Sequence, residues 1–304
     1  MRRWWQDLAD LVLPAECGGC GAPRAMLCAE CRAALTGAGP RRVRPAPTPR
    51  GLPVVCAAVP YQDAVRALLL AHKERGALGL AGPLGESLAG AVRGVVGGGG
   101  GGGGAPDAPH AHGLAPRIFA PLILVPLPSA PRATRARGHD PMRRIALAAA
   151  RVLRGAGHSV RVIPLLRQRR PVADQAGLNS RERRVNMAGA LHVPTGGARL
   201  LAAGTLGGEG RGSGRDGSRG RGTRGDLGSR GQPGTPRTSG THRDPLTLRS
   251  GLRVPGHVVL VDDLMTTGAS LSEGARALRA AGTEMRISAA VIAASPDSFD
   301  INRN

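Results

Sequence analysis

The sequence predicts an α/β fold with a parallel sheet, together with a small cysteine-rich module at the front. Apolar runs at 122–125 and, rich in valine, at 258–261 show no alternation, which is typical of parallel strands buried on both faces. Amphipathic stretches follow these runs, as expected for helices that connect parallel strands. Four cysteines lie in two Cys-x2-Cys pairs near the N-terminus, outside that strand–helix pattern.

Two stretches are not expected to contribute to the folded core. Residues 97–116 begin with eight consecutive glycines, and 195–250 consist mainly of Gly, Arg, Ser, Thr and Pro. Such segments bury too little apolar surface to offset their chain entropy, so we expect both to be disordered. They would interrupt one domain spanning 51–294, between a front module at 1–40 and a tail at 295–304. The remaining roughly 230 residues suffice for one sizeable core.

The charge of the chain favours polyanionic partners. The formal net charge is +21, and Lys73 is the only lysine among 42 basic residues. Nucleic acid, phosphorylated metabolites and anionic lipid all fit this balance, and so does a general arginine bias with a solvated surface. The chain has only five aromatic residues, which argues against a base-stacking platform.

No segment is expected to span a membrane. The apolar runs are too short to cross a bilayer, and two aspartates interrupt the apolar part of the N-terminus. Residues 1–13 instead predict a short amphipathic helix that ends at Pro14. We therefore expect a cytoplasmic protein with reduced thiols.

The front module predicts a structural zinc site. Cys17, Cys20, Cys28 and Cys31 form two Cys-x2-Cys pairs separated by seven residues. Four thiolates complete a tetrahedral zinc shell and leave no position for water, as in structural sites. Disulfides or unrelated buried thiols remain the alternative. Cys56, in a strand-like run at 51–61, is most simply a small core residue.

Basic residues accompany the next two elements. Lys73 ends an amphipathic helix, and its single use in an arginine-rich chain indicates either a need for a compact ammonium or an accidental surface lysine. Further on, a loop is expected after the strand at 122–125. The arginines of this loop are Arg132, Arg135 and Arg137. They suit bidentate binding of diphosphate oxygens, and the alternative is that they are simply solvated. A helix at 142–157 and a strand at 159–166 follow.

The segment 257–270, HVVLVDDLMTTGAS, contains the strongest functional signal. A buried strand runs into Asp262 and Asp263, and a loop of small residues then leads into a helix at 270–282. At the carboxyl edge of a parallel sheet, such a loop directs backbone N–H groups and the helix N-terminus at an anion. The residues that would bind a phosphate are Thr266, Thr267, Gly268, Ala269 and Ser270. Beside them, the two carboxylates suit sugar hydroxyls and a divalent metal.

This motif resembles the phosphoribosyl-pyrophosphate loop of type I phosphoribosyltransferases, which have a Rossmann-like sheet. The order of the two cysteine pairs, VPLP, RARGHD, the spaced Gln175, Leu178, Arg183 and Asn186, and VDDLMTTGAS is similar to the ComF family over about 12–194 and 251–294. The family usually has an aromatic residue and an asparagine where this chain has His139 and Asp140.

The resemblance implies a role for each part of the motif. Asp262 and Asp263 would hold the ribose hydroxyls and help to position Mg²⁺, and 266–270 would bind the 5-phosphate of phosphoribosyl pyrophosphate. Pyrophosphate would contact Arg132, Arg135, Arg137 and Lys73. Gln175, Arg183 and Asn186 would belong to a mobile loop over the substrate.

Two classes of function stay open at this point. The first is an enzyme that transfers phosphoribosyl to an unidentified acceptor. The second is a non-catalytic nucleic-acid-binding protein that uses the site as a sensor or phosphate clamp. The family's link with natural competence and DNA uptake adds single-stranded DNA and competence or DNA-processing proteins as expected partners.

Overall fold

The computed structural model describes residues 16–37, 39–97, 121–172, 177, 179–202 and 256–302. Several expectations fall outside these ranges: the helix at 1–13, the position of Gln175 and Leu178, and the disorder expected at 98–116 and 203–250.

The core is a six-stranded sheet with strand order β1-β2-β8-β7-β3-β4. Strand β1 is antiparallel to β2, and the other four pairings are parallel. The strands are β1 (Arg41–Val43), β2 (Val55–Pro60), β3 (Leu122–Pro126), β4 (Val160–Val162), β7 (His257–Met265) and β8 (Arg286–Ala294). A separate two-stranded ribbon joins β5 (Arg167–Gln168) to β6 (Leu191–His192). The α/β class and the mostly parallel sheet are therefore confirmed.

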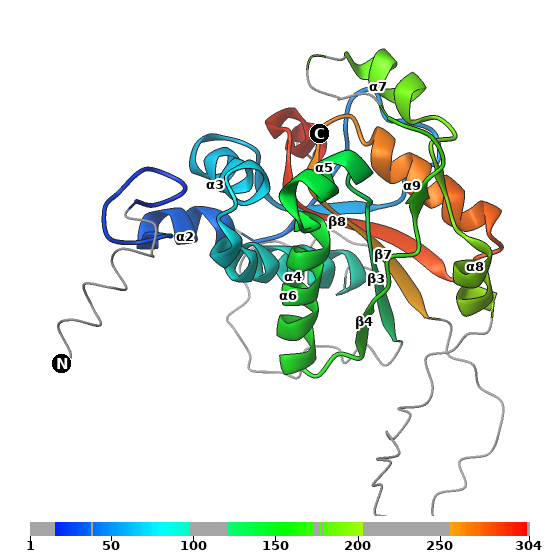
Figure 1. The fold of residues 1–304 in the computed structure, drawn as a ribbon, viewed down its shortest axis with the longest axis horizontal. Coiled ribbons are helices and arrows are strands. Elements are labelled where there is room, and N and C mark those ends of the chain that lie inside the picture. The colour runs from blue at the N-terminus through cyan, green and yellow to red at the C-terminus, as the bar shows by residue number, and fades with distance from the viewer. Residues whose placement is uncertain are drawn as a thin grey trace, which may run out of the picture. The chain divides into compact units, whose positions relative to one another are not determined.

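Helices cover both faces of the sheet (Figure 1). On one face lie α3 (Asp63–Glu74), α4 (Ala81–Gly97) and α6 (Pro141–Gly155), with the short η1 (Leu78–Leu80) between the first two. The other face is covered by α9 (Ala269–Ala280) and the β5–β6 ribbon. Alternate residues of β7 point to the two sides: Val259 packs on the α6 side and Val258 on the α9 side. Burial on both faces explains why this strand reads as a continuous apolar run.

The cysteine module packs against the first helical layer. Its helix α2 (Ala29–Thr36) is fixed to α4 where Ser87 Oγ donates to the Leu35 carbonyl over 2.8 Å. Cys17 and Cys31 are buried in the same hydrophobic cluster as α3 and α4. The module is thus continuous with the main core.

Three segments differ from the sequence-based expectation. The loop expected after β3 contains a helix, α5 (Pro131–Arg137), and the stretch expected to be disordered from 195 begins with α8 (Thr195–Ala202). The expected tail forms η2 (Pro296–Asn302), whose Phe299 is 5% exposed and lies under the Arg41 guanidinium, 5.4 Å from the ring centroid. Burial of this aromatic ring accounts for the ordered end.

Helix α4 also extends to Gly97, the first glycine of the run. Helix α7 (Ser180–Met187) follows the ribbon strand β5 and starts with a capping box between Asn179 and Glu182. Within the described residues, no helix is both long and apolar enough to cross a membrane.

Candidate functional site

A cleft of about 1300 Å³ lies at the carboxyl edge of the sheet. Its lining includes the segment after β3 and the segment after β7, two adjacent parallel strands. From β3 the chain continues into α6 on one face, and from β7 into α9 on the other. The cleft therefore lies at a topological switch point, where open α/β sheets bind ligands.

Two adjacent carboxylates and one ammonium group lie together in the lining of the cleft. Lys73 Nζ lies 3.0 Å from Asp263 Oδ2, and the Asp263 N–H donates to Asp262 Oδ1 over 3.0 Å. Burial and the neighbouring Asp263 raise the pKa of Asp262 well above its ordinary value, although Lys73 acts in the opposite direction. Asp263 in turn raises the pKa of Lys73, against the effect of burial. One ammonium thus faces two carboxylates, an arrangement that a further cation would stabilise.

The loop after β7 lines the cleft next to these carboxylates. Strand β7 continues past the two aspartates to Met265, which is longer than expected. Gly268 then adopts φ +71° as the N-cap of α9, and a Cβ there would lie 3.1 Å from Leu52 Cδ1. Only glycine adopts this conformation at low cost, and it does so here in a tight space. All five residues expected to bind a phosphate line the cleft: Thr266, Thr267, Gly268, Ala269 and Ser270.

Most of the basic residues predicted to bind substrate line the cleft. Arg132, Arg137 and Arg183 line the cleft together with Lys73. Arg183 Nη1 donates to Thr266 Oγ1 over 3.0 Å, so α7 contacts the loop after β7 directly. Arg137 donates to both carboxylate oxygens of Glu74, over 3.2 and 3.3 Å. Helix α7 thus closes one side of the cleft.

Arg135 and Asn186 are not among the residues that line the cleft. Arg135 lies on α5, where the sequence predicted a loop, and its side chain is exposed. The Asn186 carbonyl accepts a hydrogen bond from Arg170 Nη2 over 2.8 Å.

One wall of the cleft was not predicted from the sequence. Tyr61, Gln62 and Asp63 line it where β2 leads into α3. Asp63 has φ +42°, a backbone conformation that non-glycine residues rarely adopt and that is often found at functional sites. The scarcity of aromatic residues suggested that no ring was available for stacking, whereas the single tyrosine of the chain contributes to this cleft.

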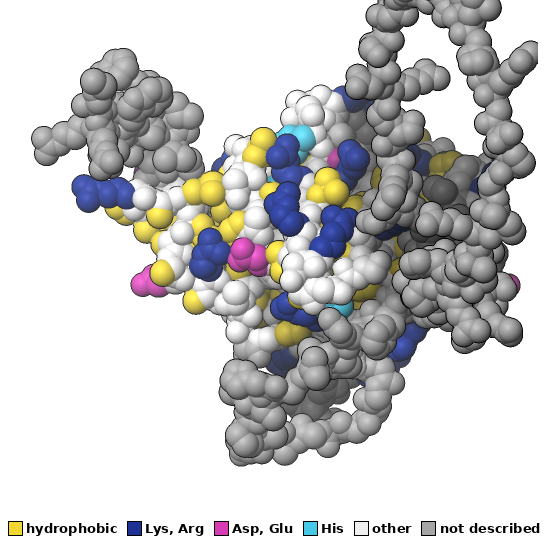
Figure 2. Space-filling model, turned by 90° about the horizontal axis from the view of Figure 1, so that it is seen from below, with side chains coloured by type: hydrophobic (Ala, Val, Ile, Leu, Met, Phe, Trp, Pro, Cys, Tyr) yellow, Lys and Arg dark blue, Asp and Glu magenta, His cyan; other side chains and the backbone are white. Residues whose placement is uncertain are grey.

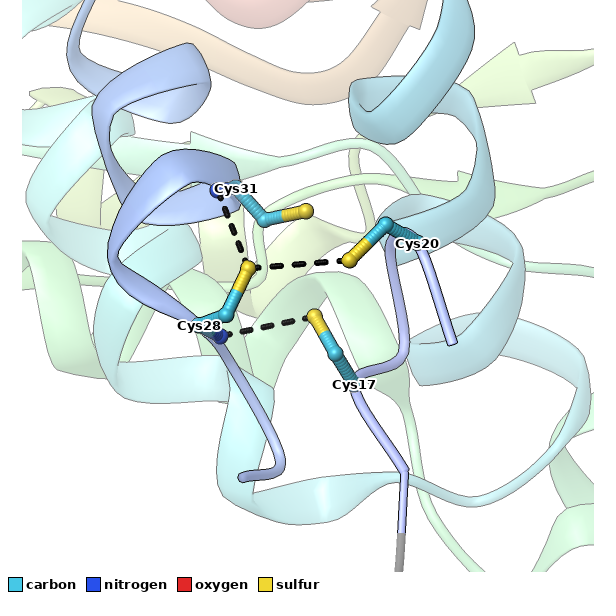
Figure 3. A group of neighbouring side chains, drawn as sticks. All are labelled: Cys17, Cys20, Cys28 and Cys31. Atoms are coloured by element: carbon cyan, nitrogen blue, oxygen red, sulfur yellow. Dashed lines mark hydrogen bonds between the residues drawn. The ribbon is translucent and has the colours of Figure 1, made fainter. Parts of the chain in front are cut away.

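The four cysteines predicted as metal ligands come together at a second site. Their sulfur atoms lie within 4.8 Å of one another and point toward a common centre (Figure 3). The Cys20 and Cys28 sulfurs are 3.6 Å apart. Four thiolates at the zinc–sulfur distance of about 2.3 Å would have neighbouring sulfurs about 3.8 Å apart. The cluster therefore fits a tetrahedral metal such as zinc.

Backbone geometry around the sulfurs also fits a metal site. The Cys28 N–H donates to Cys17 Sγ, and the Cys31 N–H donates to Cys28 Sγ, each over 3.4 Å. A Cβ on Gly19 would lie 2.6 Å from Cys31 Sγ, so a side chain there would displace that ligand. Burial raises the pKa of Cys17, but hydrogen bonds, foremost from the Cys28 N–H, outweigh it and bring the pKa down to about 6. A thiolate at this position is ready to bind a cation.

Neither Cys56 nor His139 is among the residues of the two sites. Cys56 is 2% exposed in the core, where burial raises its pKa to about 11. His139 is a partly buried residue after α5, and its Nδ1 lies 2.9 Å from the Arg137 carbonyl oxygen.

Basic side chains recur over the molecular surface. Figure 2 shows one face of the molecule, on which Lys and Arg side chains are spread widely and Asp and Glu are sparse. This distribution agrees with the net charge of +21.

Comparison with models of protein families finds no match, and comparison with curated proteins finds none either.

Proposed function

We propose that this protein binds phosphoribosyl pyrophosphate with Mg²⁺ and transfers its phosphoribosyl group to an acceptor. The observation that carries the proposal is the presence, in one switch-point cleft, of paired carboxylates, a loop of small hydroxyl residues and four arginines. These groups match the three parts of the substrate: ribose hydroxyls, 5-phosphate and diphosphate. The motif resemblance to type I phosphoribosyltransferases and to the ComF family supports the same assignment.

Different residues of the cleft suit different parts of phosphoribosyl pyrophosphate. The first amides of any α-helix have no carbonyl partner within the helix, so the first turn of α9 suits the 5-phosphate together with Thr266 and Thr267. Asp262 and Asp263 suit the ribose hydroxyls and the magnesium ion. Arg132 and Arg137 suit the diphosphate. Bound with the diphosphate, magnesium would supply positive charge that stabilises the departing group.

The reaction would be a displacement at the anomeric carbon. A nucleophilic atom of the acceptor forms a bond to that carbon as the bond to the diphosphate oxygen breaks. The electron pair of the broken bond leaves with pyrophosphate, and the acceptor's proton passes to solvent. The sugar carries positive charge in the transition state, which the carboxylates of Asp262 and Asp263 would stabilise. Positioning and charge thus account for the catalysis without a dedicated base.

A non-catalytic role is the second candidate, because the basic surface and the cysteine module also suit a nucleic-acid-binding protein that uses the cleft as a sensor. Phosphorus NMR of phosphoribosyl pyrophosphate, incubated with the protein, Mg²⁺ and a single-stranded oligonucleotide, separates the two. Appearance of pyrophosphate that depends on both the protein and the oligonucleotide would support transfer. Binding without pyrophosphate release would support the sensor.

The paired carboxylates provide the matched variant for this experiment. We expect Asp262→Ala combined with Asp263→Ala to abolish binding of phosphoribosyl pyrophosphate while the fold is retained, as judged by circular dichroism. An unchanged affinity in a folded variant would refute the site assignment.

A further inference from the structure

A second groove, of about 560 Å³, borders the main cleft at Met187 and Ala269. Four arginines from three parts of the chain line it: Arg50, Arg184, Arg276 and Arg279. Among the described residues that line it, Glu273 is the only acidic one, so these residues carry three more positive than negative charges (4 − 1). No expectation from the sequence concerned these arginines.

Two of the four arginines are held in place by contacts within the protein. Arg276 forms a bidentate pair with Glu273, with N–O distances of 2.7 and 2.8 Å, and this pair neutralises the Glu273 carboxylate. Arg279 Nη1 donates to the Gly51 carbonyl over 3.1 Å. That carbonyl is uncharged, so the positive charge of Arg279 is not compensated.

The other two guanidinium groups have no acidic partner among the residues that the structure describes. Arg50 is exposed, and its own backbone is fixed because Ser272 Oγ donates to the Arg50 carbonyl over 2.6 Å. Arg184 is partly buried on α7. The groove therefore presents three uncompensated positive charges, on Arg50, Arg184 and Arg279, from a backbone that hydrogen bonds hold in place.

Helix α7 contributes residues to both the groove and the main cleft. Its neighbouring residues Arg183 and Arg184 point about 100° apart, as consecutive helical residues do. Arg183 donates to Thr266 in the main cleft, and Arg184 lines the groove. A ligand that passes over the Met187 end of α7 could therefore contact both sites.

We propose that this groove binds consecutive phosphates of a single-stranded nucleic acid and so holds the acceptor beside the phosphoribosyl site. Arginine binds phosphate oxygens in a bidentate manner, and uncompensated arginines attract a polyanion. No aromatic residue is found among the described residues that line the groove, which points to contacts with the sugar-phosphate backbone and not with stacked bases. The role of this ligand as acceptor rests on the proposed function, whereas its binding in the groove does not.

The test compares two variants of equal charge. Arg50→Gln with Arg184→Gln removes two charges from the groove. Arg151→Gln with Arg161→Gln removes two exposed charges from α6 and β4, away from the groove. Fluorescence anisotropy measures the affinity of each for a short labelled oligothymidylate over a range of salt concentrations, and calorimetry measures phosphoribosyl pyrophosphate binding separately.

We expect the groove variant to bind the oligonucleotide about tenfold more weakly, and the slope of log K against log salt to fall by about 1.4, or about 0.7 for each lost phosphate contact on a single strand. The control variant should retain its affinity within about twofold. Equal losses in both variants would overturn the proposal, and so would a mononucleotide that binds as tightly as the oligonucleotide. If only the groove variant loses oligonucleotide affinity, but the wild-type protein does not bind phosphoribosyl pyrophosphate, the nucleic-acid groove stands and the proposed function is refuted.

Discussion

The carboxylate of Glu273, 6% exposed, accepts hydrogen bonds from the Arg276 guanidinium and from the Leu191 N–H, the latter over 3.0 Å. These bonds fix α9 to strand β6 of the ribbon. Burial acts to raise the pKa of Glu273, but the bonds from Arg276 and Leu191 outweigh it, so the pKa is lowered in the folded state. The resulting stabilisation is complete above the ordinary glutamate pKa of about 4.3 and is lost as the pH falls through the lower folded value.

Glu273→Gln is therefore expected to reduce the free energy of unfolding at pH 7 by about 1.5–3 kcal/mol, the range for hydrogen bonds to charged groups. The difference from wild type should shrink below about pH 4, where the wild-type carboxylate begins to be protonated. Urea denaturation at several pH values measures both effects. Glu284→Gln, at an exposed position, serves as the control; equal losses in the two variants at pH 7 would contradict the role given to Glu273.

Lys73 provides a prediction about the main cleft. Lys73→Gln leaves the two adjacent aspartates without their ammonium partner, so we expect phosphoribosyl pyrophosphate to bind about tenfold more weakly, or by about 1.4 kcal/mol. Arg75→Gln removes the same charge from an exposed position near the end of the same helix and should leave the affinity unchanged. Calorimetric titration measures both; equal affinities for wild type and Lys73→Gln would show that the ammonium has no part in binding.

At the level of single residues, the sequence predicted those that carry a local signal. Asp262, Asp263 and the small residues after them are contiguous, and Lys73 is unique in composition. Tyr61 and Asp63 were missed because they are about 200 positions away from the aspartates in sequence. They join the cleft only through the pairing of β2 with β8 and of β8 with β7. Long-range pairing of this kind leaves no local pattern.

At the level of elements, the contact between α4 and α6 depends on one glycine. A Cβ on Gly85 would lie 2.5 Å from Ala148 Cβ, whereas Gly90 in the same helix has open space around its Cβ position. Gly85→Ala should reduce the free energy of unfolding by about 1–3 kcal/mol through overpacking. Gly90→Ala should raise it by up to about 1 kcal/mol, because alanine favours the helix. Urea denaturation of both variants tests this; stabilisation by Gly85→Ala would show that the helices do not pack this closely.

Buried elements with a continuous apolar or amphipathic pattern were predicted with the correct type, and so was the short β4 (Val160–Val162) within the strand expected at 159–166. Strands β3 and β7 and helices α6 and α9 have continuous patterns that burial imposes on the sequence. Helix α5 was taken as a loop, although Pro131 at its first turn and Gly138 with φ +72° at its end are helix boundary signals. Seven residues are too few to show an apolar period, so these boundary signals had nothing between them to support a helix.

At the level of the whole molecule, the cysteine module and the sheet share one hydrophobic cluster, so metal binding should affect more than residues 16–37. We expect one zinc ion per chain in the purified protein and its loss in Cys28→Ser. In that variant, amide hydrogen exchange should be faster than in wild type in α2 and in the adjoining part of α3. Cys56→Ala removes a thiol outside the cluster and should retain the metal. Metal analysis by mass spectrometry decides the first point; a metal-free wild type would refute the zinc site.

The charge of the molecule and the position of its cleft are also properties of the whole chain. The excess of arginine was evident from the composition, but its concentration at the main cleft and in the adjoining groove depends on how α7 and α9 meet. Composition specifies how much charge is present, and only the fold specifies where it gathers.

Calorimetric titration of phosphoribosyl pyrophosphate into the wild-type protein, with and without magnesium, tests the central claim most directly. We predict saturable binding at one site per chain, stronger with magnesium and absent when Asp262 and Asp263 are both replaced by alanine. A folded, zinc-loaded protein that shows no binding under either condition would contradict the claim.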